Sequence, residues 1–357
     1  MERARAVRNR LVWSCQRNDG ELIVSDATDT RTDKRRTHGS PLFEFFTSYF
    51  NIISILGVFL LLFAFFSVQA DAFLTLENQV NVLRQIAPTI IVATMMTLVI
   101  TTGQIDLSVG SIIGMTASAL ALLIQTGSAL FGLIATLIIG VAAGLIQGIL
   151  AAYGKLPAFI VTLAGLIALR GVALLITQGY STPITVEWLL WLGQGKFLGL
   201  YIPTWVALIT VVFGWYLFTQ TRFGRYVVAV GSNTEALRRS GVNVKRIQAA
   251  VLVLTGLFAG LAGVLIAARL ATGSSNSGTL FELEVITAVV LGGTSLLGGR
   301  GSIVGTLIGA LTLGIIANGL VLLQVDVFWV PITQGVILII AMLLNQSAVD
   351  RFQKRKA

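Results

Sequence analysis

Residues 129–153 read ALFGLIATLIIGVAAGLIQGILAAY and contain no Asp, Glu, Lys or Arg. A helix needs about 20 apolar residues to cross a hydrocarbon layer of about 30 Å, so this stretch is long enough to span a membrane. Gly140, Gly144 and Gly148 follow one another at intervals of four residues and place bare backbone on one helix face. Helices in lipid associate through close van der Waals contact, which small residues permit. The sequence therefore predicts a membrane helix that packs through its glycine face.

Similar apolar runs recur along the chain, and they define ten candidate membrane spans. The spans are residues 50–68, 84–102, 108–125, 129–153, 157–178, 203–219, 248–268, 283–297, 301–323 and 328–346. Span 283–297 is short and span 301–323 begins a few residues later, so we expect a broken or partly re-entrant element there. The predicted fold is all-α, a polytopic membrane bundle of about ten helices that includes one short element.

Glycine spacing also predicts how these helices pack. Besides the face at 140–148, Gly256-x-x-x-Gly260 and the repeat from Gly301 to Gly309 place small residues on one side of a helix. We interpret these faces as contacts inside the bundle. Homodimerisation through one of them is the alternative.

The composition excludes several classes of protein. Of the 357 residues 55% are hydrophobic and 11% are charged, whereas about a quarter of a soluble domain is charged. Cys15 and His38 are the only cysteine and histidine, which excludes a disulfide framework, Cys or His metal clusters and histidine-based catalysis. We therefore expect no catalytic site, no metal and no cofactor. The nucleotide-binding pattern GxxxxGK[ST] does not occur, so any ATP hydrolysis must come from a separate chain.

The distribution of the net charge of +9 predicts the topology. With the N-terminus in the cytoplasm, 21 of the 25 Lys and Arg residues fall in inner segments, in accord with the positive-inside rule. Both termini are then cytoplasmic, and the basic excess indicates orientation rather than nucleic-acid binding. We divide the chain into a flexible cytoplasmic tail at 1–45, a membrane domain at 46–349 and a basic cytoplasmic tail at 350–357. The four basic residues outside the inner segments are Arg84, Arg170, Lys196 and Arg269.

The longest inner loop, residues 220–248, has the pattern of a short capped helix. Asn233 is a good N-cap, Ala236 and its neighbours favour helix, and Gly241 is a good stop. We therefore expect a helix at about 234–240 that lies outside the spans and carries Glu235 and Arg238. An ordinary basic loop at the bilayer surface is the simpler alternative. The cap and the small residue between two charged ones are more typical of a docking element.

The loop and three further blocks resemble the ribose-type monosaccharide permeases of ABC importers. The blocks are GQIDLSVGS at 103–111, LPAFIVTL at 156–163 with Arg170-Gly171 after it, and VVLGGTS at 289–295 with GGRGS at 298–302. They cover nearly the whole hydrophobic body in order. The chain departs from the family at Gln104, where glycine is commoner, and in the length of its tail at 1–45.

The resemblance implies that the chain is the pore-forming subunit of a bacterial inner-membrane importer. A second permease subunit, identical or related, would complete the pore, and a separate ATP-binding ABC subunit would hydrolyse ATP. An extracytoplasmic binding protein would deliver a ribose-like pentose or another monosaccharide. The loop helix, with Asn233, Glu235, Ala236, Arg238 and Gly241, would then dock the ATPase subunit and transmit its closure to the spans.

Five polar residues are candidates for the translocation path or its gate. Asp106 precedes a helix, where a carboxylate can cap free N–H groups; contact with sugar or with another subunit is the alternative. Gln147 and Asn318 lie deep in spans and either line the path or make interhelical hydrogen bonds. Thr294 and Ser295 stand between glycine pairs in the turn of the broken element, which we expect to face the cytoplasm and to contribute to the gate.

Two other classes of transporter compete with this interpretation. A secondary active transporter usually carries functional charged residues inside its spans, and we expect only Asp106 and Arg170 there. Arg170 is expected to extend its guanidinium towards the outer surface, with an acidic partner inside the bundle as the alternative. A channel would need a selectivity filter or a charged ring, and the sequence indicates neither.

Overall fold

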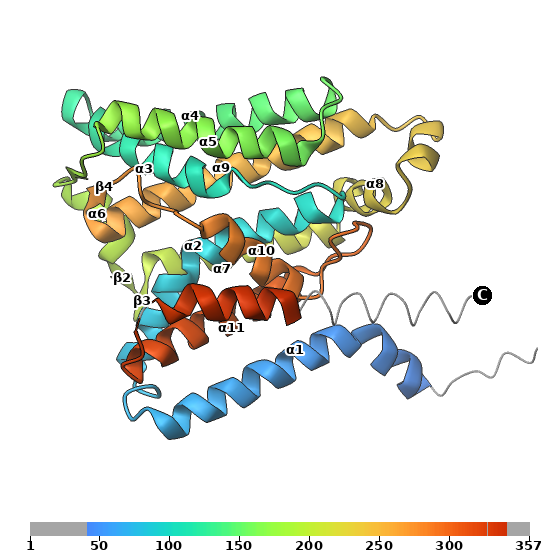
Figure 1. Cartoon of the computed structure of the whole chain (residues 1–357), viewed down its shortest axis with the longest axis horizontal. Helices are drawn as coiled ribbons and strands as arrows, with labels where there is room; N and C mark the ends of the chain where they lie inside the picture. The colour runs from blue at the N-terminus through green and yellow to red at the C-terminus, as the bar shows by residue number, and fades with distance from the viewer. Residues whose placement is uncertain (1–40, 327, 341–357) are drawn as a thin grey trace, which may run out of the picture. The chain divides into compact units, whose positions relative to one another are not determined.

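Figure 1 shows the computed structural model of the chain, which describes residues 41–326 and 328–340, with side chains from Ile53 onward. The predicted all-α fold is confirmed. In chain order the helices are α1 (Pro41–Gln69), α2 (Leu76–Thr101), α3 (Val109–Thr126), α4 (Ala129–Ala152), α5 (Ala158–Thr177), α6 (Glu187–Gln194), α7 (Ile202–Thr219), α8 (Arg222–Arg239), α9 (Val244–Leu270), α10 (Phe281–Leu291) and α11 (Ile303–Leu322), followed by a helix at Trp329–Ile340.

Seven of these helices are long and apolar enough to cross a membrane. They are α2, α3, α4, α5, α7, α9 and α11. Each one coincides with a predicted span, although α2 begins at Leu76 and not at residue 84. Residues 1–40 of the predicted N-terminal tail and the whole C-terminal tail at 350–357 lie outside the described residues. The predicted N-terminal tail extends to residue 45, whereas α1 already begins at Pro41.

The predicted short element is α10, which has 11 residues. At about 1.5 Å per residue such a helix is about half as long as a membrane is thick. The loop at 292–302 separates α10 from α11, whose first turn is capped by the Ser302 hydroxyl at 3.0 Å from the Gly305 N–H. A broken element therefore occupies 281–322, as its glycine-rich turn predicted.

The predicted glycine faces of α4 and α9 pack against each other. A Cβ atom on Gly144 would overlap the carbonyl oxygen of Leu252, and one on Gly256 would overlap that of Gly140. The repeat in α11 contacts α10 in the same way, because a Cβ on Gly309 would overlap the Ala288 carbonyl oxygen. These faces are covered by other helices of the same chain, so the alternative that one of them forms a homodimer interface is wrong.

Sequence patterns did not predict the elements at the end of the bundle opposite α8 (Figure 1). This end carries the short helix α6 and two antiparallel pairs of two-residue strands, β1 (Thr182–Pro183) with β4 (Thr272–Gly273) and β2 (Lys196–Phe197) with β3 (Leu200–Tyr201). Elements this short carry too little periodicity to be recognised. Lys196 of β2 and Arg84 of α2 lie at this end, where both cations lie over the Tyr201 ring.

Candidate coupling helix and polar interior

The helix α8 is divided by a kink at Asn233. The backbone there is extended, with φ −160° and ψ 89°, and the Ala236 N–H donates to Asn233 Oδ1 at 2.9 Å. Asn233 therefore caps the second half of α8, as the sequence predicted. The kink changes the prediction in one respect, because the segment from Arg222 to Ser232 before the kink is also helical.

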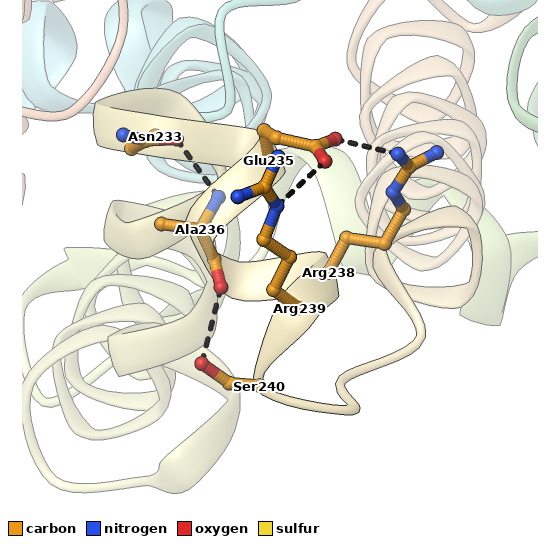
Figure 2. A network of polar contacts seen from close by, with 6 residues as sticks. All are labelled: Asn233, Glu235, Ala236, Arg238, Arg239 and Ser240. Atoms are coloured by element: carbon orange, nitrogen blue, oxygen red, sulfur yellow. Dashed lines mark hydrogen bonds and ion pairs between the residues drawn. The ribbon is translucent and has the colours of Figure 1, made fainter. Parts of the chain in front are cut away.

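The second half of α8 carries a paired charge on an exposed surface, which Figure 2 shows. Glu235 accepts hydrogen bonds from Arg238 at 2.7 Å and from Arg239 at 3.1 Å, and half or more of each side chain is exposed. These hydrogen bonds, the one from Arg238 foremost, hold the pKa of Glu235 below its ordinary value of 4.5. The half-helix ends at Ser240, and Gly241 follows in the left-handed conformation with φ +83°.

The first half of α8 contacts two other segments at Gly231. A Cβ atom there would overlap both the carbonyl oxygen of Thr101, at the end of α2, and the backbone nitrogen of Gly299, in the loop after α10. The Gly299 N–H donates to the Thr101 carbonyl at 2.8 Å. Three backbone segments therefore meet at one point, four to eight residues before the exposed charges of α8.

Thr294 and Ser295 lie in the loop that takes part in this junction. Thr294 is fully buried, and its hydroxyl accepts the Ser302 N–H at 3.3 Å. The Ser295 N–H donates to the Arg300 carbonyl at 3.0 Å, which closes the turn. The loop is thus a compact structure held by its own backbone, at the same end of the bundle as α8 (Figure 1).

Asp106 and Gln147 are brought together through Ser108. The Asp106 Oδ1 atom accepts the backbone N–H of Ser108 at 2.8 Å and lies 2.6 Å from its hydroxyl, which is 2.9 Å from Gln147 Oε1. All three residues are buried. Asp106 Oδ2 has no hydrogen-bond partner among the described residues. Asp106 therefore holds the backbone just before α3, which is the first of the roles expected for it.

Arg170 turns into the bundle, so the expectation that it extends to the outer surface is wrong. Its Nη1 donates to the carbonyls of Ser275 and Ser277, and its Nη2 donates to those of Gly110 and Gly278. These carbonyls belong to the first turn of α3 and to the turns at 275–280 before α10. One guanidinium therefore fixes the place where two helices begin. The physical reason is that four hydrogen bonds to backbone carbonyls, three of them outside any helix, outweigh the distance to water.

Sequence reasoning missed two acidic residues at the start of α10, one buried and one partly buried. Glu282 is buried beside Gly110 and interacts electrostatically with Arg170. Glu284 accepts the Thr89 hydroxyl at 2.8 Å and interacts electrostatically with Arg269. The expectation that only Asp106 and Arg170 are charged inside the bundle is therefore wrong. The signal was present, since two carboxylates within a predominantly apolar stretch mark a functional position in a membrane.

Asn318 lies apart from the other candidates. Its side chain exchanges two hydrogen bonds with Asn78, at 2.9 and 3.0 Å, and so joins α11 to the start of α2. The five predicted path residues thus form three separate groups. Asp106 and Gln147 lie before α3, Thr294 and Ser295 lie in the loop after α10, and Asn318 joins α2 to α11.

The family model described as branched-chain amino acid transport system, permease component, matches residues 78–344. The chain belongs to this family. The matched range contains nearly all of α2 and extends through α11, so it includes the candidate coupling helix, the glycine junction and the polar interior. This permease is accordingly a multi-pass membrane protein and the non-catalytic component of its transport system.

Curated relatives cover most of the permease. It is 43% identical over 291 residues to the ribose import permease protein RbsC of Escherichia coli (strain K12), over 80% of this chain and 91% of RbsC. It is 39% identical over 298 residues to the L-arabinose ABC transporter permease protein AraH of Azospirillum brasilense (83% and 88%). It is 32% identical over 364 residues to the xylose transport system permease protein XylH of Escherichia coli (84% and 93%). No solved structure matches the chain.

Proposed function

We propose that this permease moves a simple sugar, a ribose-like pentose first, as a subunit of an ATP-driven importer of the bacterial inner membrane. The relatives support the sugar class, because their names give ribose, L-arabinose and xylose, all of them pentoses. An extracytoplasmic binding protein delivers the sugar and a separate ABC subunit hydrolyses ATP. The alternative, a secondary transporter, has no support from the family of permease components to which the chain belongs.

The end of the bundle that carries α8 faces the cytoplasm in this proposal. Three of the segments predicted to lie inside meet at this end. Lys245 lies over the ring of Tyr153, and Gly231 of α8 contacts Gly299 in the loop at 292–302. Arg84 and Lys196, two of the four basic residues outside the predicted inner segments, lie together at the opposite end over the Tyr201 ring. Such a distribution is typical of a membrane protein whose basic end is inside. Both termini would then be cytoplasmic.

The second half of α8 is the docking site for the ATPase subunit, and its geometry carries the proposal. It is a capped helix with two exposed arginines around an exposed carboxylate, Glu235. An exposed ion pair of this kind contributes little to the stability of the chain alone, because water screens it. The conformation fixed by Asn233 and Gly241 is therefore better explained by a partner protein that binds this half-helix.

The junction at Gly231 transmits the movement of the ATPase subunit. Helix α8 contacts the end of α2 and the loop at 292–302 without intervening side chains, so a displacement of α8 must move both. Thr294 and Ser295 lie in that loop and so belong to the gate. ATP binding favours one of two arrangements of the subunits, and the gate follows this shift in population.

The translocation path passes Arg170. This residue lies near the middle of α5, about 18 Å from its start, yet it is only partly buried. An arginine that faced lipid at this depth would be costly, whereas one beside a water-filled path can bind sugar hydroxyls. The exposed face of α5, with Ile167 and Leu175, then contacts the second permease subunit, identical or related.

Uptake of radiolabelled ribose by cells that express the whole importer tests the proposal. Glu235→Arg would bring three cations together and repel the partner surface, so we expect uptake to fall by at least tenfold while membrane insertion is unchanged. Deletion of 234–240 should abolish uptake. The matched control is Glu187→Arg, at the start of α6 on the opposite end of the bundle. Normal sugar uptake by the Glu235→Arg variant would remove the coupling role.

A further inference from the structure

An apolar groove of about 940 Å³ runs along α9 between α4 and α7. Its walls are Leu145 and Ile149 of α4 and Phe213 and Leu217 of α7, and its floor includes Val253 and Leu254 of α9. The first three of these side chains are exposed, so the groove opens on the outside of the bundle. It ends where Phe213 stacks on Phe258, with ring centroids 6.0 Å apart.

The other end of the groove is basic. Arg246 lines it from the first turn of α9, and the Lys245 ammonium lies 5.5 Å from the ring of Tyr153, which lines the groove from α4. The positive end of the α9 dipole points to the same place. No carboxylate is among the described residues that line the groove. The nearby acidic residue Glu235 already pairs with two arginines of α8.

The groove has the length of a lipid chain segment. Arg246 and Leu254 are eight residues apart on α9, which is about 12 Å along the helix axis. Over this length the lining changes from a cation to purely apolar side chains. A sugar does not fit this surface, because its hydroxyls would lie against hydrocarbon without partners.

We propose that the groove binds an anionic phospholipid, with an acyl chain along α9 and the phosphate at Arg246 and Lys245. Charge complementarity supports this occupant over others. The C-terminal segment 350–357 has four basic residues and one acidic residue and would be repelled. Two copies of the chain related by an axis along the membrane normal would bring two Lys245–Arg246 pairs to the same depth. An anionic lipid neutralises the pair instead.

Native mass spectrometry of the full chain in detergent tests the proposal. The probes are dioleoyl phosphatidylglycerol and dioleoyl phosphatidylcholine, each added alone at equal concentration. We expect the wild-type chain to retain the anionic lipid preferentially. Lys245→Gln and Arg246→Gln should each lower its affinity about fivefold, as expected for one basic residue near a lipid surface. Ala250→Leu keeps the charges, narrows the groove and should weaken binding of both lipids.

The matched control is Arg225→Gln, which removes an exposed arginine of α8 that does not line the groove. Equal affinity of the wild-type chain for the two lipids would overturn the proposal, as would an Arg225→Gln effect equal to that of Arg246→Gln. A disulfide-linked dimer formed by Leu254→Cys in a Cys15→Ser background would place a second copy in the groove, and that result also overturns it. Sugar uptake is not a readout here, so the outcome is independent of the coupling role of α8.

Discussion

At the scale of single residues, the buried polar groups of this permease act mainly on backbone. Asp106 accepts the Ser108 N–H, and Arg170 donates to four carbonyls at the starts of α3 and α10. The backbone before α10 forms turns, and carbonyl groups outside a helix need other hydrogen-bond partners inside a membrane bundle. Side chains that satisfy them allow two helices to begin inside the bundle. A membrane helix that begins in this way leaves an irregular polar segment beside the path.

Two variants of Asp106 distinguish a structural role of this residue from a role in the proposed translocation path. Asp106→Ala leaves the Ser108 N–H without an acceptor and should destabilise the chain by about 1–3 kcal/mol. Asp106→Asn keeps the acceptor and removes a buried charge, so we expect its unfolding midpoint to stay near that of the wild type. Thermal unfolding followed by tryptophan fluorescence in detergent measures both. If Asp106→Asn folds normally but loses uptake, Asp106 contacts the substrate and its role is not only structural.

The second prediction at this scale concerns the pH dependence of the ion pairs that Glu235 makes. Its folded-state pKa lies below 4.5, so the stabilising pairing with Arg238 and Arg239 is complete above that pH and is lost as the pH falls through the lowered pKa. Nuclear magnetic resonance of the labelled Glu235 carboxyl carbon should therefore give a midpoint below 4.5. In the Arg238→Gln, Arg239→Gln double variant the midpoint should rise towards 4.5. An identical midpoint in both proteins would contradict the pairing.

At the scale of elements, α8 consists of two half-helices with different surroundings. The half before Asn233 contacts the end of α2 and the loop at 292–302, and the half after it is exposed. An uninterrupted helix would point both halves in one direction. The kink instead allows one half to pack on the bundle while the other stays exposed.

Gly231→Ala tests the junction between these elements. The added methyl group would overlap two backbone atoms that cannot move as a side chain can, so we expect α8 to shift and uptake to fall at least tenfold. The matched control is Gly57→Ala in α1, where no atom lies within 4 Å of the added group. Sugar uptake at equal membrane expression is the measurement. Equal uptake by the two variants would show that the close approach at Gly231 does not transmit movement.

How far the sequence predicted these elements depends on their length and pattern. Long apolar runs gave the spans, and the Asn233 and Gly241 signals gave the ends of the exposed half-helix, because both rest on local physics. The glycine spacing of 140–148 predicted a packing face but could not name α9 as its partner. The inward turn of Arg170 could not be predicted, since its acceptors lie between 60 and 108 residues away in the chain.

At the scale of the whole molecule, the permease has an exposed, charged half-helix at one end, which we propose as the input, and a polar interior, where we propose a path beside Arg170. The interior residues Glu282 and Glu284 stand at the start of the short helix α10, and the loop that ends α10 contacts α8. Input and path are therefore joined by a single short element. This arrangement suits a transporter that is driven by a partner and carries no nucleotide site of its own.

The most direct test of this account is sugar uptake by proteoliposomes that contain the permease, its ATPase subunit and its binding protein. The account predicts that radiolabelled ribose enters only when ATP and all three components are present, and that Glu235→Arg permease abolishes both uptake and co-purification of the ATPase subunit. A proton ionophore should have no effect. Uptake that persists without the ATPase subunit and collapses when the proton gradient is removed would contradict the account.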